Sequence, residues 1–291
     1  MSSARAFLGG IIDYAGMFPP ARLGMDDAIR EYARYREGSD NDLLGRFILP
    51  ASRLGEFSSA AQSFVARKDP WKISAIVSAG SETDIDMISE FNAEQAGVVV
   101  DAIEMPVHSA SEIEWAASHF GKSFSLFLEP PLVPDCTDLL EAISKAGVAA
   151  KIRTGGVVPG AIPSASAVLR FIENCATLAL PFKATAGLHH AIRGRYPLTY
   201  DSDAPRGKMF GYLNVFLTAA FLRAGLPASS LLDLLEEEDA SSITFSDDGV
   251  RWRGNLADTS TLADTRKSLS VSFGSCSFTE PVDEAKQLHL I

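Results

Sequence analysis

The sequence lacks an apolar run long enough to cross a membrane, because a spanning helix needs roughly 18 consecutive apolar residues and no segment reaches that length. Its opening stretch, MSSARAFLGGIIDYAGMFPP, also lacks the basic start, the long apolar centre and the cleavage site of a secretory signal peptide. These two absences lead us to expect a cytoplasmic protein.

Cysteine and positive charge are also scarce. The three cysteines, Cys136, Cys175 and Cys276, are widely spaced and match neither a zinc-binding pattern nor a disulfide framework, so we expect free thiols. The net charge is −11, whereas sequence-independent binding to nucleic acid or to an anionic membrane needs a basic face. We therefore expect small molecules as partners, and neither nucleic acid nor membrane.

What the sequence does contain is a regular alternation of short apolar runs and segments with helical period. The runs occupy residues 9–16, 45–51, 72–80, 96–106, 123–131, 147–156, 180–190 and 269–278. Between them, for example, Ser109 and Glu112 form a capping box that marks a helix start. This alternation predicts parallel βαβ units, and eight of them fit a (β/α)8 TIM barrel. At 291 residues and 46% hydrophobic content, we expect a single domain covering 1–291.

Two segments depart from this alternation. SSITFSDDGVRWRG reads as an inserted β-hairpin turned at Asp248 and Gly249, although the same segment could form the eighth strand. We prefer the insertion because Arg251 and Arg253 would share a face that suits solvent better than a barrel interior. Residues 191–207 form a long polar connection, of a length typical of a lid, a binding loop or a disordered segment.

In two of the apolar runs, a lysine is followed within a few residues by Thr and Gly. Lys151 lies in VAAKIRTGG and Lys183 in LPFKATAGLHH, and adjacent parallel strands lie about 4.8 Å apart, so two inward lysines at similar heights become neighbours. Desolvation and mutual repulsion would lower the pKa of one amine, and Arg153 would add to the positive field. A neutral amine there could form a Schiff base with a carbonyl substrate. The alternative is a salt-bridged or snorkelling lysine pair.

At these residues the sequence resembles a known family. AAKIRTGG and PFKATAGLHHAIR resemble the K-T-S-T-G and K-P-A-G-G-V-R motifs of class I deoxyribose-phosphate aldolases, and VSFGSCSF resembles their F-G-x-S-S segment. The resemblance implies that Lys151 is the Schiff-base lysine, that Lys183 tunes it, and that Asp101 relays protons. It also implies an anion site built from backbone N–H groups near Gly187, Gly274 and Ser275.

The sequence departs from the family motifs beside both lysines. Ile152 and Arg153 replace small polar residues, Leu188 stands in place of the second glycine, and His189 and His190 have no counterpart. We therefore expect a divergent relative with a different pocket and a different substrate.

Further polar residues lie at strand ends, where barrel active sites form. Asp13 could face the site or cap a turn, and Glu129 could face the site. Glu104 has the opposite parity to Asp101, so we expect only one of the two to point inward, and the resemblance favours Asp101. At most one of His189 and His190 should lie in the pocket, and Cys276 should be a buried, inert thiol. The residues expected to bind substrate are Asp13, Glu129, Arg153, Thr154, Thr185, Gly187, His189, Arg193, Gly274 and Ser275.

Together these observations favour an aldolase-type lyase that needs no cofactor and forms a Schiff base with a small, anionic carbonyl compound. One alternative is a metal-dependent lyase or hydrolase that uses Asp13, Glu104, Glu129 and one of the two adjacent histidines. Another is a barrel that binds an anionic metabolite without turning it over. Such barrels often assemble, so a homo-oligomer is compatible with the sequence.

Overall fold

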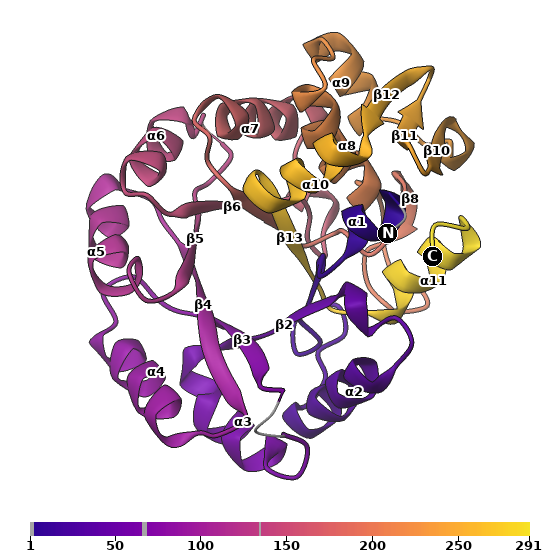
Figure 1. Cartoon of the computed structure of the whole chain (residues 1–291). Coiled ribbons are helices and arrows are strands. Elements are labelled where there is room, and N and C mark those ends of the chain that lie inside the picture. The colour runs from indigo at the N-terminus through magenta and orange to yellow at the C-terminus, as the bar shows by residue number, and fades with distance from the viewer. Residues whose placement is uncertain (1–2, 66–68, 134) are drawn as a thin grey trace.

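The structure is a computed structural model that describes residues 3–65, 69–133 and 135–291. Eight parallel strands close into a barrel, and the last of them pairs with the first (Figure 1). These strands are β1 (Ile12–Tyr14), β2 (Leu44–Pro50), β3 (Trp71–Ile76), β4 (Val98–Pro106), β5 (Ser125–Glu129), β6 (Ala149–Arg153), β7 (Phe182–Thr185) and β13 (Ser270–Ser275). Each overlaps one of the eight apolar runs, so the predicted (β/α)8 TIM barrel is confirmed.

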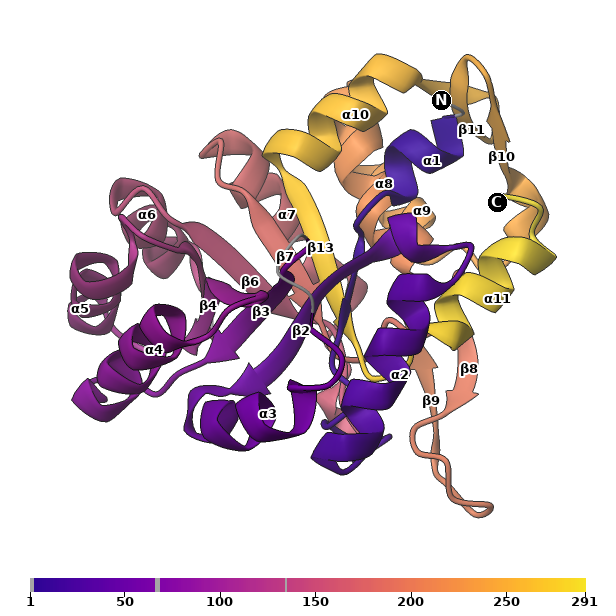
Figure 2. The same ribbon diagram turned by 60° about the horizontal axis from the view of Figure 1, so that its bottom comes forward.

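Helices surround the barrel and alternate with its strands (Figures 1 and 2). They are α1 (Ser3–Leu8), α2 (Met25–Glu37), α3 (Leu54–Ala61), α4 (Glu82–Glu94), α5 (Ala110–Phe120), α6 (Thr137–Lys145), α7 (Ala165–Thr177), α8 (Tyr212–Arg223), α9 (Ala228–Leu235), α10 (Thr259–Ser268) and α11 (Thr279–Gln287). Ser81, Ser109 and Ser164 cap three of them by accepting a backbone N–H three residues further on. The helix start expected at Ser109 is therefore present.

The helix α8 is buried along most of its length. Its residues from Tyr212 to Phe221 are all buried, because α7, α9 and α10 pack around it. A helix that is apolar on all sides is expected only where it is covered on all sides. The amide of Asn214 donates to the carbonyls of Leu234 and Glu237, which satisfies this buried polar group and fixes the end of α9.

The segment before the last barrel strand forms a separate antiparallel sheet of β10 (Ile243–Ser246), β11 (Gly249–Trp252) and β12 (Asn255–Asp258). The predicted insertion is thus correct, and β13 closes the barrel. The turn lies one residue earlier than expected, because Ser246 pairs with Gly249, and the third strand was not predicted. A Cβ at Gly249 would lie 2.2 Å from the carbonyl oxygen of Ala257, so only glycine fits there.

The long polar connection after β7 is an ordered hairpin. Its strands are β8 (Gly194–Pro197) and β9 (Arg206–Met209), which pair antiparallel and project beyond the barrel (Figure 2). Of the three alternatives for this connection, the disordered segment is therefore wrong for these two strands. Leu198 and Met209, at the base of the hairpin, are buried side chains that help to line the cavity described below.

An arginine ties together backbone segments at the end of the barrel where its strands begin. Arg266, on α10, donates to the backbone carbonyls of Phe7, Gly9, Ser270 and Val271. Burial lowers its pKa to about 10. Active sites of such barrels form at the opposite end, where the strands finish.

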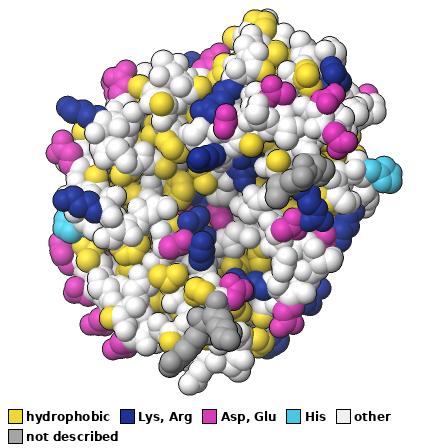
Figure 3. All heavy atoms as spheres, viewed as in Figure 1, with side chains coloured by type: hydrophobic (Ala, Val, Ile, Leu, Met, Phe, Trp, Pro, Cys, Tyr) yellow, Lys and Arg dark blue, Asp and Glu magenta, His cyan; other side chains and the backbone are white. Residues whose placement is uncertain are grey.

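Charged side chains of both signs are interspersed over the face of the molecule seen in Figure 1, with no broad area of one sign (Figure 3). In the described part of the chain, no helix is both long enough and apolar enough to cross a membrane.

The interior of the barrel is polar at its centre. Interiors of such barrels are usually filled with Val, Ile and Leu, whereas here the inward side chains include Ser74, Glu104, Lys151, Lys183 and Asp13, all buried. Buried charges are tolerated only when they are paired and hydrogen-bonded. The barrel core therefore has to contain an ion-pair network.

Candidate active site

The two lysines singled out in the sequence are neighbours. Lys151 on β6 and Lys183 on β7 are Cα partners in the parallel register, and their exposed fractions are 4% and 0%. The predicted adjacency of two inward lysines at one height is confirmed. Their environments differ, because only Lys151 borders the cavity described below.

Lys183 lies at the centre of a closed network. Its Nζ donates to Asp13 Oδ2 and to Glu104 Oε1, at 2.6 Å in each case. The Asp13 carboxylate also accepts from Ser272 Oγ at 2.7 Å, and Glu104 accepts from Ser74 Oγ at 2.7 Å. The two carboxylates are thus held in place by hydrogen bonds from side chains of three different strands. Ser74 and Ser272 were not singled out in the sequence, although each interrupts an apolar strand at an inward position.

Lys151 is also paired with carboxylates. Its Nζ lies 2.9 Å from Glu104 Oε2 and 2.7 Å from Glu129 Oε2, and Glu129 in turn accepts from Arg153 Nε at 2.8 Å. Burial opposes its positive charge, but Glu104 and Glu129 outweigh burial and raise the pKa of Lys151. The expectation that Lys183 and Arg153 lower this pKa is therefore wrong, because strands 4 and 5 bring two carboxylates to the amine.

The lysines hold both glutamates in the ionised form. Burial favours protonation of Glu104, but Lys151 and Lys183 outweigh it and hold its pKa far below the usual range. Likewise, Lys151 and Arg153 outweigh burial and lower the pKa of Glu129. Both glutamates are therefore ionised at neutral pH.

Glu104, and not Asp101, contacts the lysines. Asp101 instead pairs with Arg46, whose Nε lies 2.7 Å from Asp101 Oδ1. The parity argument failed because β4 contains a register shift, with Val100 opposite Ile73 but Ala102 opposite Ser74, so that Asp101 is an extra residue. A bulge of this kind changes which later side chains face inward. Asp101 also precedes Glu104 on β4, so it lies nearer to the end of the barrel where the strands begin.

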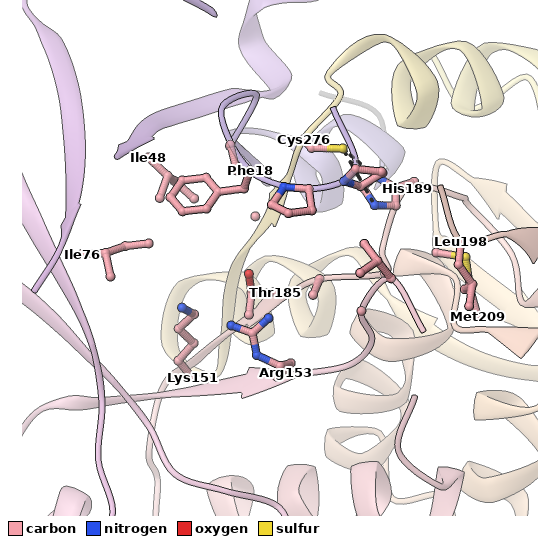
Figure 4. Close-up of a pocket in the computed structure, with 18 of the residues that line it drawn as sticks. Phe18, Ile48, Ile76, Lys151, Arg153, Thr185, His189, Leu198, Met209 and Cys276 are labelled. Carbon is pink, nitrogen blue, oxygen red and sulfur yellow. Dashed lines mark hydrogen bonds between the residues drawn. The ribbon is translucent and has the colours of Figure 1, made fainter. Parts of the chain in front are cut away.

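A cavity of about 250 Å³ opens above Lys151. Its charged lining residues are Glu104, Lys151 and Arg153, and the guanidinium of Arg153 lies between Lys151 and Thr185 (Figure 4). The rest of the wall is largely apolar. It includes Ala15, Phe18, Pro19, Pro20, Ile48, Ile76, Val157, Ala186, Leu198 and Met209.

Most of these apolar residues were missed in the sequence. Ile48 and Ile76 lie on β2 and β3, and their inward parity could have identified them, whereas Leu198 and Met209 come from the hairpin, whose position depends on tertiary contacts. Phe18, Pro19 and Pro20, which follow the first strand, also line the cavity.

Five of the residues expected to bind substrate line the cavity from the ends of β6, β7 and β13. They are Arg153, Thr185, Gly187, His189 and Gly274. Thr154 does not line it, because its Oγ1 donates to Ala186 O at 2.7 Å and so ties together the segments that follow β6 and β7. The same two segments touch at Gly155 and Gly187, where a Cβ on Gly187 would lie 3.1 Å from the Gly155 Cα.

Of the residues expected near a backbone anion site, Gly187 and Gly274 line the cavity. Gly274 lies in register between Asp13 and Thr185, inside the sheet, and the buried Ser275 hydroxyl is within 3.2 Å of His189 Nδ1. Arg193 is also placed elsewhere, since it does not line the cavity and its Nη1 lies 3.1 Å from Glu236 Oε1. The local sequence could not reveal that Glu236, on another segment, neutralises this arginine.

Of the two histidines, only His189 borders the Lys151 cavity. Burial, together with the charge of His190, lowers the pKa of His189 to about 4, so it is neutral at neutral pH. His190 points to Glu284, with its Nδ1 2.6 Å from Oε1. Cys276 is a free, buried thiol beside His189, and burial raises its pKa to about 11, as expected for an inert cysteine.

Within the described residues, no group of three or more His, Cys, Asp and Glu side chains is arranged to hold a metal ion. The carboxylates of the metal alternative are instead in contact with ammonium groups, since Asp13 and Glu104 bind Lys183, and Glu129 binds Lys151. A cation there would have to displace two buried lysines.

Comparison with protein-family models finds no match. Comparison with curated protein sequences finds none either. Among solved structures, the chain is similar to one titled as a crystal structure of dihydropteroate synthetase with Product1, at 10% sequence identity and a TM-score of 0.32, over 97% of this chain and 94% of that chain. This likeness is too weak to bear on activity.

Proposed function

We propose that the protein is a barrel enzyme of the aldolase-type lyase class, which forms a Schiff base through Lys151 with a small, anionic carbonyl compound. One observation carries this proposal. Lys151 is a buried lysine whose amine borders a cavity and is flanked by two carboxylates within proton-transfer distance.

The raised pKa of Lys151 sets the first step. The ammonium has to lose a proton before it can attack, and Glu129 and Glu104, at 2.7 and 2.9 Å, are within reach to accept it. The neutral Nζ then bonds to the carbonyl carbon. The carbonyl oxygen leaves as water with the two remaining amine protons, and protonation of the resulting imine gives the iminium ion.

Carbon–carbon cleavage follows from the iminium ion. A base removes the proton from the substrate hydroxyl, the electron pair of the bond to be broken moves towards the iminium nitrogen, and the second carbonyl fragment leaves. Protonation and hydrolysis of the enamine then release the first fragment. Lys183 acts as a positioning residue in this scheme, because it holds Glu104 ionised and oriented.

Borohydride trapping tests the proposal. The protein is incubated with small aldehydes, 2-oxo acids and sugar phosphates, reduced, and examined by peptide mass spectrometry. We expect a reduced adduct on Lys151 that is absent from Lys151→Met and undiminished in Lys72→Met, a control at an exposed lysine of β3. An adduct on another lysine, or none with any compound, would contradict the proposal.

The raised pKa of Lys151 also favours a second candidate, a barrel that binds an anionic metabolite without turning it over. Here the charged lysine is a binding group and forms no bond. Binding that persists at the same affinity in Lys151→Met, without trapping in the native protein, would point to this candidate.

A further inference from the structure

We infer that the cavity takes a short, unphosphorylated 2-oxo acid whose carboxylate is bound by Arg153 and whose chain is apolar apart from the 4-hydroxyl that the cleavage step requires. This inference rests on the proposed function for the attachment of the carbonyl carbon to Lys151, and it adds the class of substrate. Four features of the cavity carry it.

The first feature is the position of Arg153. It lies two residues after Lys151 on the same face of β6, about 6.6 Å further along the strand. In a 2-oxo acid the carboxylate is bonded directly to the carbonyl carbon, so a carbonyl carbon at Lys151 places the carboxylate beside Arg153. Figure 4 shows both side chains facing the same space.

The second feature is that a carboxylate already bridges these two cations. Glu129 binds Lys151 with one oxygen and Arg153 Nε with the other. In the part of the chain that the structure describes, this is the only ion pair that Arg153 makes, and its side chain is 54% exposed. Its remaining N–H groups are therefore available for a second carboxylate.

The third feature is the charge of the lining. Lys151 and Arg153 contribute two positive charges, and Glu104 together with Glu129, which contacts both cations, contributes two negative charges. His189 is neutral at neutral pH, so these groups carry no net positive charge. A 2-oxo acid adds one negative charge, whereas a phosphate monoester carries about −1.5 to −2 at neutral pH and would leave a larger uncompensated charge.

The fourth feature is that carboxylates of the protein occupy the usual phosphate position. Barrels of this fold often bind phosphate near the segments after strands 7 and 8 and the start of a short helix. Here Glu284, on α11, accepts the backbone N–H of Ala191 at 2.6 Å and pairs with His190. Glu280, in the first turn of α11, accepts from Tyr200 at 3.1 Å. A phosphate would meet two negative groups there.

The size and walls of the cavity complete the description of the substrate. A volume of about 250 Å³ lies below the range of roughly 300–1,000 Å³ typical of pockets for drug-sized ligands, which indicates a small molecule. Opposite Lys151 lie Phe18, Ile48 and Ile76 (Figure 4). An aliphatic chain would bury its surface against these side chains, whereas a second charged group would be desolvated there.

Calorimetric binding to the unmodified protein tests the inference with four probes. They are 2-oxopentanoate, its neutral counterpart pentan-2-one, the equally long diacid 2-oxoglutarate, and dihydroxyacetone phosphate. We expect 2-oxopentanoate to bind about tenfold more tightly than each of the others, as one charge-assisted contact allows. Tightest binding of dihydroxyacetone phosphate or 2-oxoglutarate, or no binding of 2-oxopentanoate, would overturn the inference.

Arg153→Gln tests the proposed carboxylate contact. Because this arginine is half-exposed, we expect the preference for 2-oxopentanoate over pentan-2-one to fall about fivefold. Arg195→Gln, a control at an exposed arginine of β8, should leave the preference unchanged. An unchanged preference in Arg153→Gln would also overturn the inference.

Binding and trapping distinguish the two proposals. If 2-oxopentanoate binds best through Arg153 but no adduct forms on Lys151, the substrate class holds and the Schiff-base function fails. If adducts form on Lys151 with dihydroxyacetone phosphate in preference to 2-oxopentanoate, the function holds and the substrate class fails.

Discussion

Two lysines stand side by side on adjacent strands, yet they occupy different environments. Lys183 is fully buried between Asp13 and Glu104, with the hydroxyls of Ser272 and Ser74 completing the hydrogen bonds of those carboxylates. Lys151 shares Glu104 but borders the cavity. The same residue type at the same height in the barrel can therefore hold the core together or face a substrate.

The difference comes from what lies above each amine. The Lys183 amine is surrounded by protein groups, so a substrate could reach it only by displacing them. The Lys151 amine has the cavity beside it and can exchange a contact with Glu129 for one with a ligand. Position on the open side of the network, and not burial alone, makes Lys151 the better candidate for reaction.

The largest expected effect is a difference in stability between variants of the two lysines. Lys183→Met leaves two buried carboxylates without their shared cation, so the free energy of unfolding should fall by about 3–5 kcal/mol. Lys151→Met should lower the free energy of unfolding by about 2 kcal/mol or less, because Glu104 is still paired with Lys183 and Glu129 is still paired with Arg153. Urea unfolding curves measure both values.

Lys72→Met is the control for these curves, and as an exposed substitution it should stay within about 0.5 kcal/mol of the native protein. Equal losses for the two buried lysines would show that they are not divided into a structural and an accessible member.

An intermediate effect concerns the pH at which Lys151 becomes reactive. Its pKa is raised because Glu104 and Glu129 stabilise the ammonium, so the trapping rate in the native protein should rise with pH into the alkaline range. Removing one of these charges lowers the pKa of Lys151. Glu129→Gln should therefore shift the rise in trapping rate to lower pH.

Glu104→Gln should shift the same profile in the same direction and, unlike Glu129→Gln, should also destabilise the fold, because Glu104 contacts both lysines. A shift towards higher pH in either variant would contradict the electrostatic account of this site.

The smallest effect lies at the far side of the cavity, where His189 is buried and neutral. Its folded-state pKa of about 4 is below the ordinary value of 6.5, so between these values the unfolded chain binds more protons and stability rises with pH. Glu104 and Glu129 also have lowered pKa values, but their contribution is lost only below about pH 4.5.

As the pH is lowered from about 6.5 to 5, the free energy of unfolding of His189→Asn should therefore fall less than that of the native protein. Below pH 4 it should still fall in both proteins. Thermal unfolding at intervals of pH measures this difference. A variant whose stability falls as steeply as that of the native protein between pH 6.5 and 5 would argue against a buried neutral imidazole.

Much of the fold follows from short-range patterns in the sequence. Eight apolar runs separated by helical segments predicted all eight barrel strands, and Asp248 with Gly249 marked the inserted hairpin to within one residue. Lys151 and Lys183 were predicted to be neighbours because the period of a strand and the spacing between parallel strands are regular.

Other features of the site depended on residues that are distant in the sequence. Parity indicated that only one of Asp101 and Glu104 points inward, and the resemblance favoured Asp101, but the bulge in β4 arises from its pairing with β3. The pKa of Lys151 was expected to fall, but the carboxylates that raise it come from β4 and β5. Arg193 was expected near the substrate, but Glu236 holds it away from the cavity.

The sequence by itself determined the elements, their order and the two lysines at the centre, because these depend on periodicity and on residue type along one strand. Only the tertiary structure decided which carboxylate meets which lysine, which lysine faces the cavity, and that apolar residues cover the space above it. Electrostatic shifts and cavity walls depend on through-space distances, and closing the barrel fixes those distances among strands that lie far apart along the chain.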